Sequence, residues 1–160
     1  HWIALAAQEL DAEGADAERR VEVLARLSVA MADAFIGCWH EKFRWNLVRP
    51  VTVIRATLDP AFDPLILTPP FPEYPSGHSV QSAAAAAVLD AAFGPNHAFT
   101  DRTHDDDGLE ARSFPSFRAA AEEAALSRLY GGIHFRSAVE QGLLMGACIG
   151  AHAAGLDTAR

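Results

Sequence analysis

Residues 76–94 read SGHSVQSAAAAAVLDAAFG, and this stretch decides the fold class. Alanine and leucine are strong helix formers. The hydroxyl of Ser76 can cap the first turn, and Gly94 can end the last one. We therefore predict a helix here, with chemically useful groups at its N-terminus: the serine, Gly77 and His78.

Helical periodicity continues on both sides of this stretch. From Asp16 to Arg44, apolar residues recur at the spacing of an amphipathic helix. Further helices are predicted from Ser116 to about Tyr130 and from Ser137 to Leu156. In the segment from Asp16 to Arg44 we expect core contacts from Val21, Leu24, Leu27, Met31, Ala34 and Phe35.

The connections between the predicted helices are long. Seven prolines between Arg49 and Pro75 exclude long helices and favour an ordered, extended segment. Residues 95–112 are polar and irregular, and the sequence has no strand-like alternation, internal repeat or low-complexity tract. We predict an all-α fold, a helical bundle forming one domain over residues 1–160.

Gly142, Gly146 and Gly150 recur at every fourth position of the longest apolar stretch. This spacing favours close helix packing, and in a lipid-facing helix it would be a dimerisation motif. The stretch is shorter than the roughly 20 residues that cross a bilayer, and it contains His152. We predict a close helix crossing in a soluble protein, without a transmembrane segment.

Composition limits the classes of partner. The formal net charge is -8 and the isoelectric point is near 5.2, which argues against nucleic acid or an anionic membrane surface as the main partner. Cys38 and Cys148 form neither a metal-binding pair nor a disulfide framework. We therefore expect both cysteines to act as small apolar side chains. The chain opens at His1 without a leader pattern, and its localisation is not determined.

Three short motifs carry the chemistry. Lys42 and Arg49 place two cations seven positions apart, ahead of a proline. The segment 75–78, Pro-Ser-Gly-His, puts backbone N–H groups, a hydroxyl and an imidazole at a helix N-terminus, which suits an anion. Arg128 and His134 add a cation and a second imidazole. Each motif alone is compatible with solvated or structural residues, but together they predict one oxyanion site.

In this order, K-x6-RP, PSGH and SR-x5-H resemble the superfamily that joins type 2 phosphatidic acid phosphatases with vanadium-dependent haloperoxidases. The resemblance spans about Trp39 to Gly150. The lead-in PPFPEYPSGH and the segment WHEKF are most similar to vanadium chloroperoxidases and their bacterial relatives. There Trp39 and Phe71 match aromatic residues on the halide side, although core packing explains each equally well. A phenylalanine at position 71 resembles chloroperoxidases, whereas bromoperoxidases typically carry histidine.

The resemblance implies vanadate as the cofactor, in a site that phosphate or sulfate can also occupy. It implies that cations and N-terminal donors hold the oxygens of the ion. These groups are Lys42, Arg49, Arg128, the Ser76 hydroxyl and the Gly77 N–H.

The same resemblance assigns separate roles to the two histidines. His134 would be the axial ligand of the metal through a neutral ring nitrogen. His78 would deprotonate hydrogen peroxide, and Lys42 would polarise the peroxide toward attack by halide. The implied activity is that of a vanadium-dependent haloperoxidase, with hydrogen peroxide and halide as small-molecule substrates.

Two alternatives remain at this point. In a phosphatase acting on a phosphomonoester, His134 would attack phosphorus and His78 would protonate the leaving oxygen. The wider pattern places an orienting aspartate where this chain has Ala138, and Glu140 lies on another helical face. This loss disfavours phosphatase activity, and it also leaves open a non-catalytic domain that binds oxyanions.

The haloperoxidases are longer, and this chain resembles only their C-terminal, site-bearing half. A missing N-terminal bundle would leave apolar surface for a partner or a second copy of the chain. The acidic run His104–Asp107 is a weak candidate for a hard cation, because consecutive residues cannot easily surround one. Serine hydrolase chemistry is not expected, since the chain has no G-x-S-x-G elbow.

Overall fold

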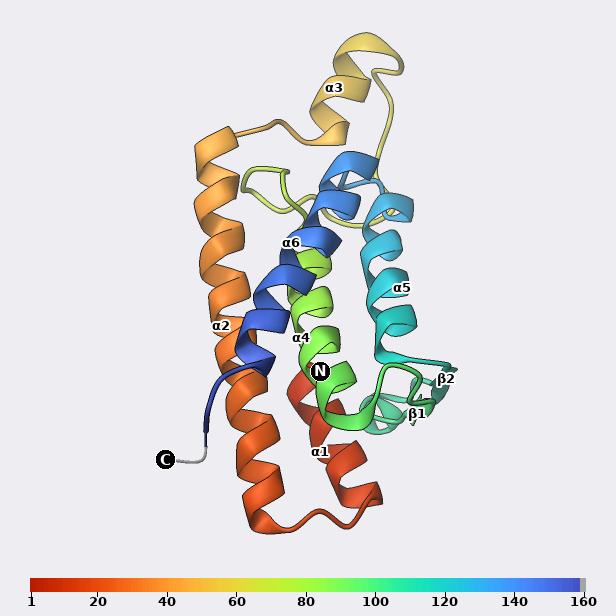
Figure 1. Cartoon of the computed structure of the whole chain (residues 1–160). Helices are drawn as coiled ribbons and strands as arrows, with labels where there is room; N and C mark the ends of the chain where they lie inside the picture. Colours follow the sequence, from red (N-terminus) through yellow and green to blue (C-terminus); the bar gives the residue numbers. More distant parts are fainter. Residues whose placement is uncertain (159–160) are drawn as a thin grey trace.

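Helix α4 (Gly77–Phe93) runs through the middle of the bundle and contacts four of the other helices (Figure 1). The structure, a computed structural model, describes residues 1–158. The Ser76 hydroxyl oxygen accepts the Ser79 N–H at 3.4 Å, and Gly94 ends the helix with a positive φ of 103°. The prediction for this stretch is therefore confirmed, including both of its ends.

Four of the other helices pack around α4, namely α1 (Trp2–Ala12), α2 (Ala17–Trp45), α5 (Phe117–Tyr130) and α6 (Arg136–Ala154). The short helix α3 (Pro50–Thr57) lies beyond one end of the bundle (Figure 1). The side chains of Asp16 and Ser116 cap the N-termini of α2 and α5, as is typical of these residue types. The all-α prediction is confirmed, although α1 and α3 were not anticipated. Helix α3 occupies the start of the proline-rich segment that was expected to be extended, with Pro50 in its first turn.

The polar stretch after α4 contains a small antiparallel sheet. Strands β1 (Phe99–Asp101) and β2 (Arg112–Phe114) pair with Thr100 opposite Ser113. A single turn of 3-10 helix, Asp105–Asp107, lies between the strands. This stretch is thus more ordered than its composition indicates.

Helix α2 buries a regular stripe toward α4, formed by Val23, Leu27, Ala30, Ala34 and Cys38. Leu24 and Met31 pack against this core from its edge. The expected core contacts of Val21 and Phe35 are wrong, because these side chains are 68% and 50% exposed. Both side chains therefore lie outside the buried stripe.

Helices α4 and α6 cross at very close range. A methyl group at Gly146 would overlap the carbonyl oxygen of Val80, and one at Gly150 would overlap that of Ala84. At Gly142 a methyl carbon would lie 2.7 Å from the Ser79 Cβ. The glycines therefore mark a close helix crossing, as predicted from their spacing.

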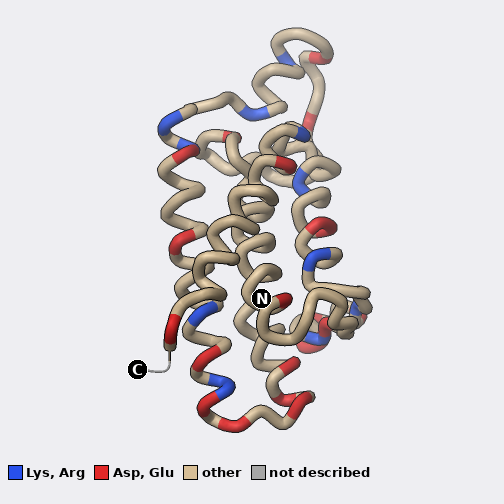
Figure 2. The backbone as a smooth tube through the Cα atoms, in the orientation of Figure 1, with Lys and Arg blue, Asp and Glu red and all other residues tan. Residues whose placement is uncertain are grey.

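Acidic residues gather where α1 connects to α2, at the lower end of the bundle in Figure 2. They include Asp11, Glu13, Asp16 and Glu18. The N-terminus of α4 lies toward the opposite end (Figure 1), so this negative charge is remote from the predicted anion site. Among residues 1–158, none of the helices combines the length and the apolar character needed to cross a bilayer.

Candidate oxyanion and active site

The three predicted motifs meet at the N-terminus of α4. The Ser76 N–H donates to the Ala138 carbonyl oxygen at 3.0 Å, which places the start of α6 beside the start of α4. His134 lies just before α6, and Arg128 lies in the last turn of α5. Residues that are distant in the sequence are therefore brought together around one point.

A cavity of about 690 Å³ opens beside this point. Most of its wall is apolar, with Met31 and Phe35 from α2 among the lining side chains. The predicted residues that line it are Trp39, Phe71, Gly77, His78, Arg128 and His134. Lys42, Arg49 and Ser76 are instead buried beneath the wall. The predicted site residues thus fall into two groups, one that lines the cavity and one that is buried behind the lining residues.

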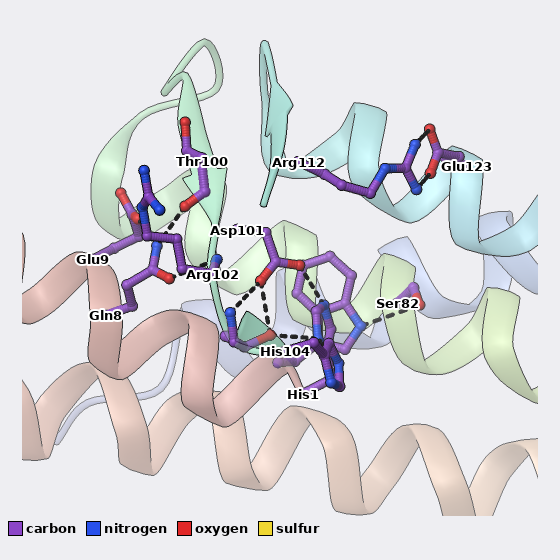
Figure 3. Close-up of polar contacts among 12 residues, drawn as sticks. His1, Gln8, Glu9, Ser82, Thr100, Asp101, Arg102, His104, Arg112 and Glu123 are labelled. Atoms are coloured by element: carbon purple, nitrogen blue, oxygen red, sulfur yellow. Dashed lines mark hydrogen bonds and ion pairs between the residues drawn. The ribbon is translucent and has the colours of Figure 1, made fainter. Parts of the chain in front are cut away.

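The cavity is also lined by His1, Asp101 and His104, which belong to a polar cluster (Figure 3). His1 Nδ1 lies 3.2 Å from His104 Nε2, and His1 Nε2 lies 3.4 Å from a carboxylate oxygen of Asp101. Trp2 donates its indole N–H to the Ser82 hydroxyl at 3.1 Å, which ties α1 to α4. These contacts hold the chain start against the bundle.

The acidic run that was considered for a cation is engaged in local contacts. His104 Nδ1 lies 2.9 Å from the Asp107 carboxylate, and Arg102 lies 3.5 Å from that of Asp105. Within residues 1–158, no group of three or more histidine, cysteine, aspartate or glutamate side chains is arranged to hold a metal ion.

Lys42 is fully buried, and its ammonium group is held by main-chain oxygens. Nζ donates to the carbonyl oxygens of Pro72 and Glu73, both at 2.9 Å. Burial lowers the pKa of Lys42 to about 8, and the nearby Arg49 guanidinium also lowers it. The lysine is therefore a cation near neutral pH that loses its charge under mildly alkaline conditions.

Arg49 is also buried and joins two parts of the site. Nε donates to the Phe71 carbonyl oxygen at 3.0 Å, and one terminal nitrogen donates to the Ile133 carbonyl oxygen at 2.8 Å. The same terminal nitrogen lies 3.1 Å from Nε2 of His134. Arg49 thus connects the proline-rich segment with the second histidine.

His134 is oriented by a carboxylate that the sequence did not reveal. Its Nδ1 lies 3.0 Å from Oε1 of Glu73, and that oxygen also accepts the Phe135 N–H at 2.9 Å. Burial lowers the pKa of His134, while the Glu73 hydrogen bond opposes this effect. The expectation that His134 lacks an orienting acid because position 138 is alanine is therefore wrong.

Glu73 was missed because it lies 61 residues before His134. The only available signal was an acidic residue within the otherwise apolar lead-in PPFPEYPSGH. Ala138 is fully buried, and its carbonyl oxygen holds the Ser76 N–H. Position 138 therefore serves the contact between α4 and α6.

His78 and Arg128 both line the cavity wall. The walls remove part of the water around the His78 ring, and this desolvation, with smaller effects of Arg128 and His134, lowers the pKa of His78 to about 4. Among the described residues, Nε of Arg128 is buried without a hydrogen-bond partner. A buried guanidinium N–H without an acceptor is costly, and an anion in the cavity would supply that acceptor.

These groups fit a tetrahedral oxyanion. The first N–H groups of α4 have no partner within the helix and form its positive end. The Ser76 hydroxyl accepts from Ser79 but keeps its own proton available to donate. The site therefore offers donors and positive charge from several directions beside a neutral histidine.

The comparisons with known proteins identify the family. Residues 22–61 and 56–159 match the family model described as the VCPO second helical-bundle domain. The chain belongs to this family. The resemblance inferred from the three motifs is thereby confirmed for most of the chain.

Solved structures agree with this membership. A bacterial vanadium-dependent iodoperoxidase superposes on 96% of this VCPO-family chain, with a TM-score of 0.92 and 49% sequence identity. A holo-type bacterial vanadium-dependent chloroperoxidase superposes on 84% of it, with a TM-score of 0.71 and 21% identity, and shares the fold. The chain spans 37% and 35% of those two proteins.

A curated relative agrees as well. The vanadium-dependent bromoperoxidase of Ascophyllum nodosum is 36% identical over an alignment of 94 residues that covers 51% of this chain and 17% of that protein. The VCPO-family chain is therefore much shorter than the relatives it matches.

Proposed function

We propose that this chain carries the vanadate site of a haloperoxidase that oxidises halide with hydrogen peroxide, and that iodide is its preferred halide. The observation that carries the proposal is that Arg128, whose buried Nε has no hydrogen-bond partner among the described residues, lines the same cavity as Gly77 and an oriented His134. Family membership and 49% identity to an iodoperoxidase support this choice over other oxyanion chemistry.

The residues divide the work of binding. Lys42, Arg49 and Arg128 balance the charge of the anion, and the Ser76 hydroxyl and the Gly77 N–H donate to its oxygens. Nε2 of His134, which lies 3.1 Å from the Arg49 guanidinium, is the nitrogen that would hold the metal. Bound vanadate would supply the Lewis-acid centre at which hydrogen peroxide is activated toward halide.

His78 is placed to move a proton. Its lowered pKa keeps the ring neutral at ordinary pH, so a lone pair is available to accept the proton of hydrogen peroxide. An anion bound nearby opposes the effect of the cations and strengthens this base. Trp39 and Phe71, with ring centroids 5.2 Å apart, form the apolar wall that we assign to the halide side.

One observation also favours phosphatase activity as a second candidate. Glu73 orients His134 as a nucleophile requires, which removes the objection based on Ala138. The same groups that fit vanadate fit phosphate, because both are tetrahedral oxyanions. A non-catalytic domain would keep the binding and lack both activities.

Activity measurements separate these functions. Protein loaded with orthovanadate should oxidise iodide in a peroxide-dependent reaction, and it should act more slowly on bromide and chloride. Orthovanadate without protein and protein loaded with sulfate serve as controls. Hydrolysis of p-nitrophenyl phosphate by the metal-free protein, without halide oxidation after loading, would instead identify a phosphatase.

The lowered pKa of Lys42 predicts opposite pH effects on binding and stability. Sulfate remains a dianion across this range, and its affinity should fall as the pH rises through and beyond about 8, because the buried amine becomes neutral. Between pH 8 and the usual lysine pKa, the unfolded chain holds a proton that the folded chain has lost. The free energy of unfolding of the anion-free protein should therefore rise with pH, by about 3 kcal/mol across this interval.

Calorimetric titration with sulfate and denaturant unfolding, each at several pH values, measure these two effects. Lys42→Met keeps an apolar chain of similar length and should lose both. A parent protein whose sulfate affinity stays constant from pH 7 to 9 would show that Lys42 does not contribute to the anion site.

A further inference from the structure

We propose that Glu73 is the positioning residue for His134, fixing the ring in one orientation and one tautomer. The proposal rests on the function proposed above for His134. In the wider pattern an acid four positions after the histidine orients the ring, and that position is Ala138 here. We assign this orienting role to Glu73, which lies before α4.

The contact is buried and made by two groups. Glu73 is 1% exposed and His134 is 5% exposed, so water does not compete for the hydrogen bond between them. Oε1 of Glu73 lies 3.0 Å from Nδ1 of His134, and it also accepts the Phe135 N–H at 2.9 Å. The ring and the backbone next to it are therefore fixed to the same oxygen.

The partners on the two sides of the ring determine its tautomer. Arg49 is a donor only, and its terminal nitrogen lies 3.1 Å from Nε2 of His134. Nε2 must then be the acceptor, and the proton lies on Nδ1, where it is donated to Glu73. In this tautomer the single lone pair of Nε2 accepts from Arg49, and the same nitrogen could bind a metal once the Arg49 N–H turns to an oxygen of the anion.

The backbone of Glu73 extends this effect to a second site residue. Its carbonyl oxygen accepts Nζ of Lys42 at 2.9 Å, while its side chain holds His134. One residue therefore sets the position of a cation from α2 and of the histidine before α6. Movement of this segment would displace both groups together.

Two substitutions separate orientation from charge. Glu73→Gln keeps an acceptor oxygen for the ring and removes the negative charge, whereas Glu73→Ala removes both. If the carboxylate acted only by its charge, both variants would bind anions more tightly. If it positions the ring, vanadate affinity should stay within about threefold in Glu73→Gln and fall about 10- to 100-fold in Glu73→Ala.

Sulfate provides the matched ligand, because it needs the cations but forms no bond to histidine. Sulfate affinity in Glu73→Ala should remain within about threefold of the parent, or increase. The matched variant Glu140→Gln changes an exposed acid that pairs with Arg136 on α6, and it should alter neither affinity. Parallel loss of vanadate and sulfate binding in Glu73→Ala, with a lower melting temperature, would show a structural role and overturn the proposal.

A spectroscopic measurement is independent of vanadium. Nitrogen-15 NMR of the metal-free parent and of Glu73→Gln should show His134 with its proton on Nδ1, and Glu73→Ala should show a mixture of tautomers. A parent ring protonated on Nε2, or unchanged vanadate affinity in Glu73→Ala, would overturn the assignment. A parent that binds vanadate without oxidising halide would refute the proposed function and leave this comparison intact.

Discussion

Replacing Gly146 with alanine should destabilise the fold by about 2–4 kcal/mol, because the added methyl group meets the main-chain oxygen of Val80. The Val80 carbonyl belongs to the backbone of the first turn of α4 and cannot move aside as a flexible side chain can. The helix-forming advantage of alanine over glycine, about 1 kcal/mol, works in the opposite direction and is smaller. Chemical denaturation of parent and variant measures the difference.

The same substitution should also weaken sulfate binding. Helix α6 would have to move away from α4, and the hydrogen bond between the Ala138 carbonyl and the Ser76 N–H links that movement to the anion site. Gly155→Ala is the control, because a methyl carbon there would lie 3.6 Å from its nearest neighbour, an ordinary contact. A Gly146→Ala protein as stable as the parent would contradict the close crossing of the two helices.

The two histidines should respond differently to replacement by alanine. His134→Ala removes the nitrogen proposed to bind the metal, so vanadate affinity should fall by more than about 100-fold. His78→Ala leaves that nitrogen and the buried cations in place, so vanadate should still bind within a few-fold of the parent. Halide oxidation by His78→Ala should nevertheless slow by about 10² to 10⁴, the usual contribution of a general base.

Titration with orthovanadate and initial rates of iodide oxidation, measured on the same preparations, test this pair. His152→Ala, which removes an exposed histidine of α6, should match the parent in both measurements. If His134→Ala binds vanadate as tightly as the parent, His134 is not the metal ligand.

Local signals in the sequence were sufficient to predict most helices. Ser76 and Gly94 mark the ends of α4, and apolar spacing marks α2, because these effects act within a few residues. Helix α1 lacks a capping side chain at His1 and carries no acidic residue in its first turn, so its start has no such mark. The strands β1 and β2 are three residues each, too short to show alternation.

The candidate site was predicted as a set of residues but not as an arrangement. The motifs identified the cations and histidines, and the structure brings them to one place. Sequence spacing could not show that Lys42 and Arg49 lie beneath the cavity wall, bound to main-chain oxygens. Nor could it show the partner of His134, because Glu73 reaches it only after α4, α5 and α6 have packed.

The carbonyl groups that hold the two buried cations bear on how this protein can be redesigned. Lys42 and Arg49 are held by the backbone of residues 71–73 and by that of Ile133. A carbonyl oxygen is present whatever the side chain, so a new residue at Phe71 would keep the acceptor for Arg49. The wall proposed to face the halide can therefore be varied without removing these main-chain hydrogen bonds, as long as the path of the backbone is preserved. A substitution at Phe71 would still remove a ring whose centroid lies 5.1 Å from the Arg49 guanidinium and 5.4 Å from Nζ of Lys42. A library of substitutions at Trp39 and Phe71 would accordingly test the proposed halide side while the main-chain acceptors of both cations are kept.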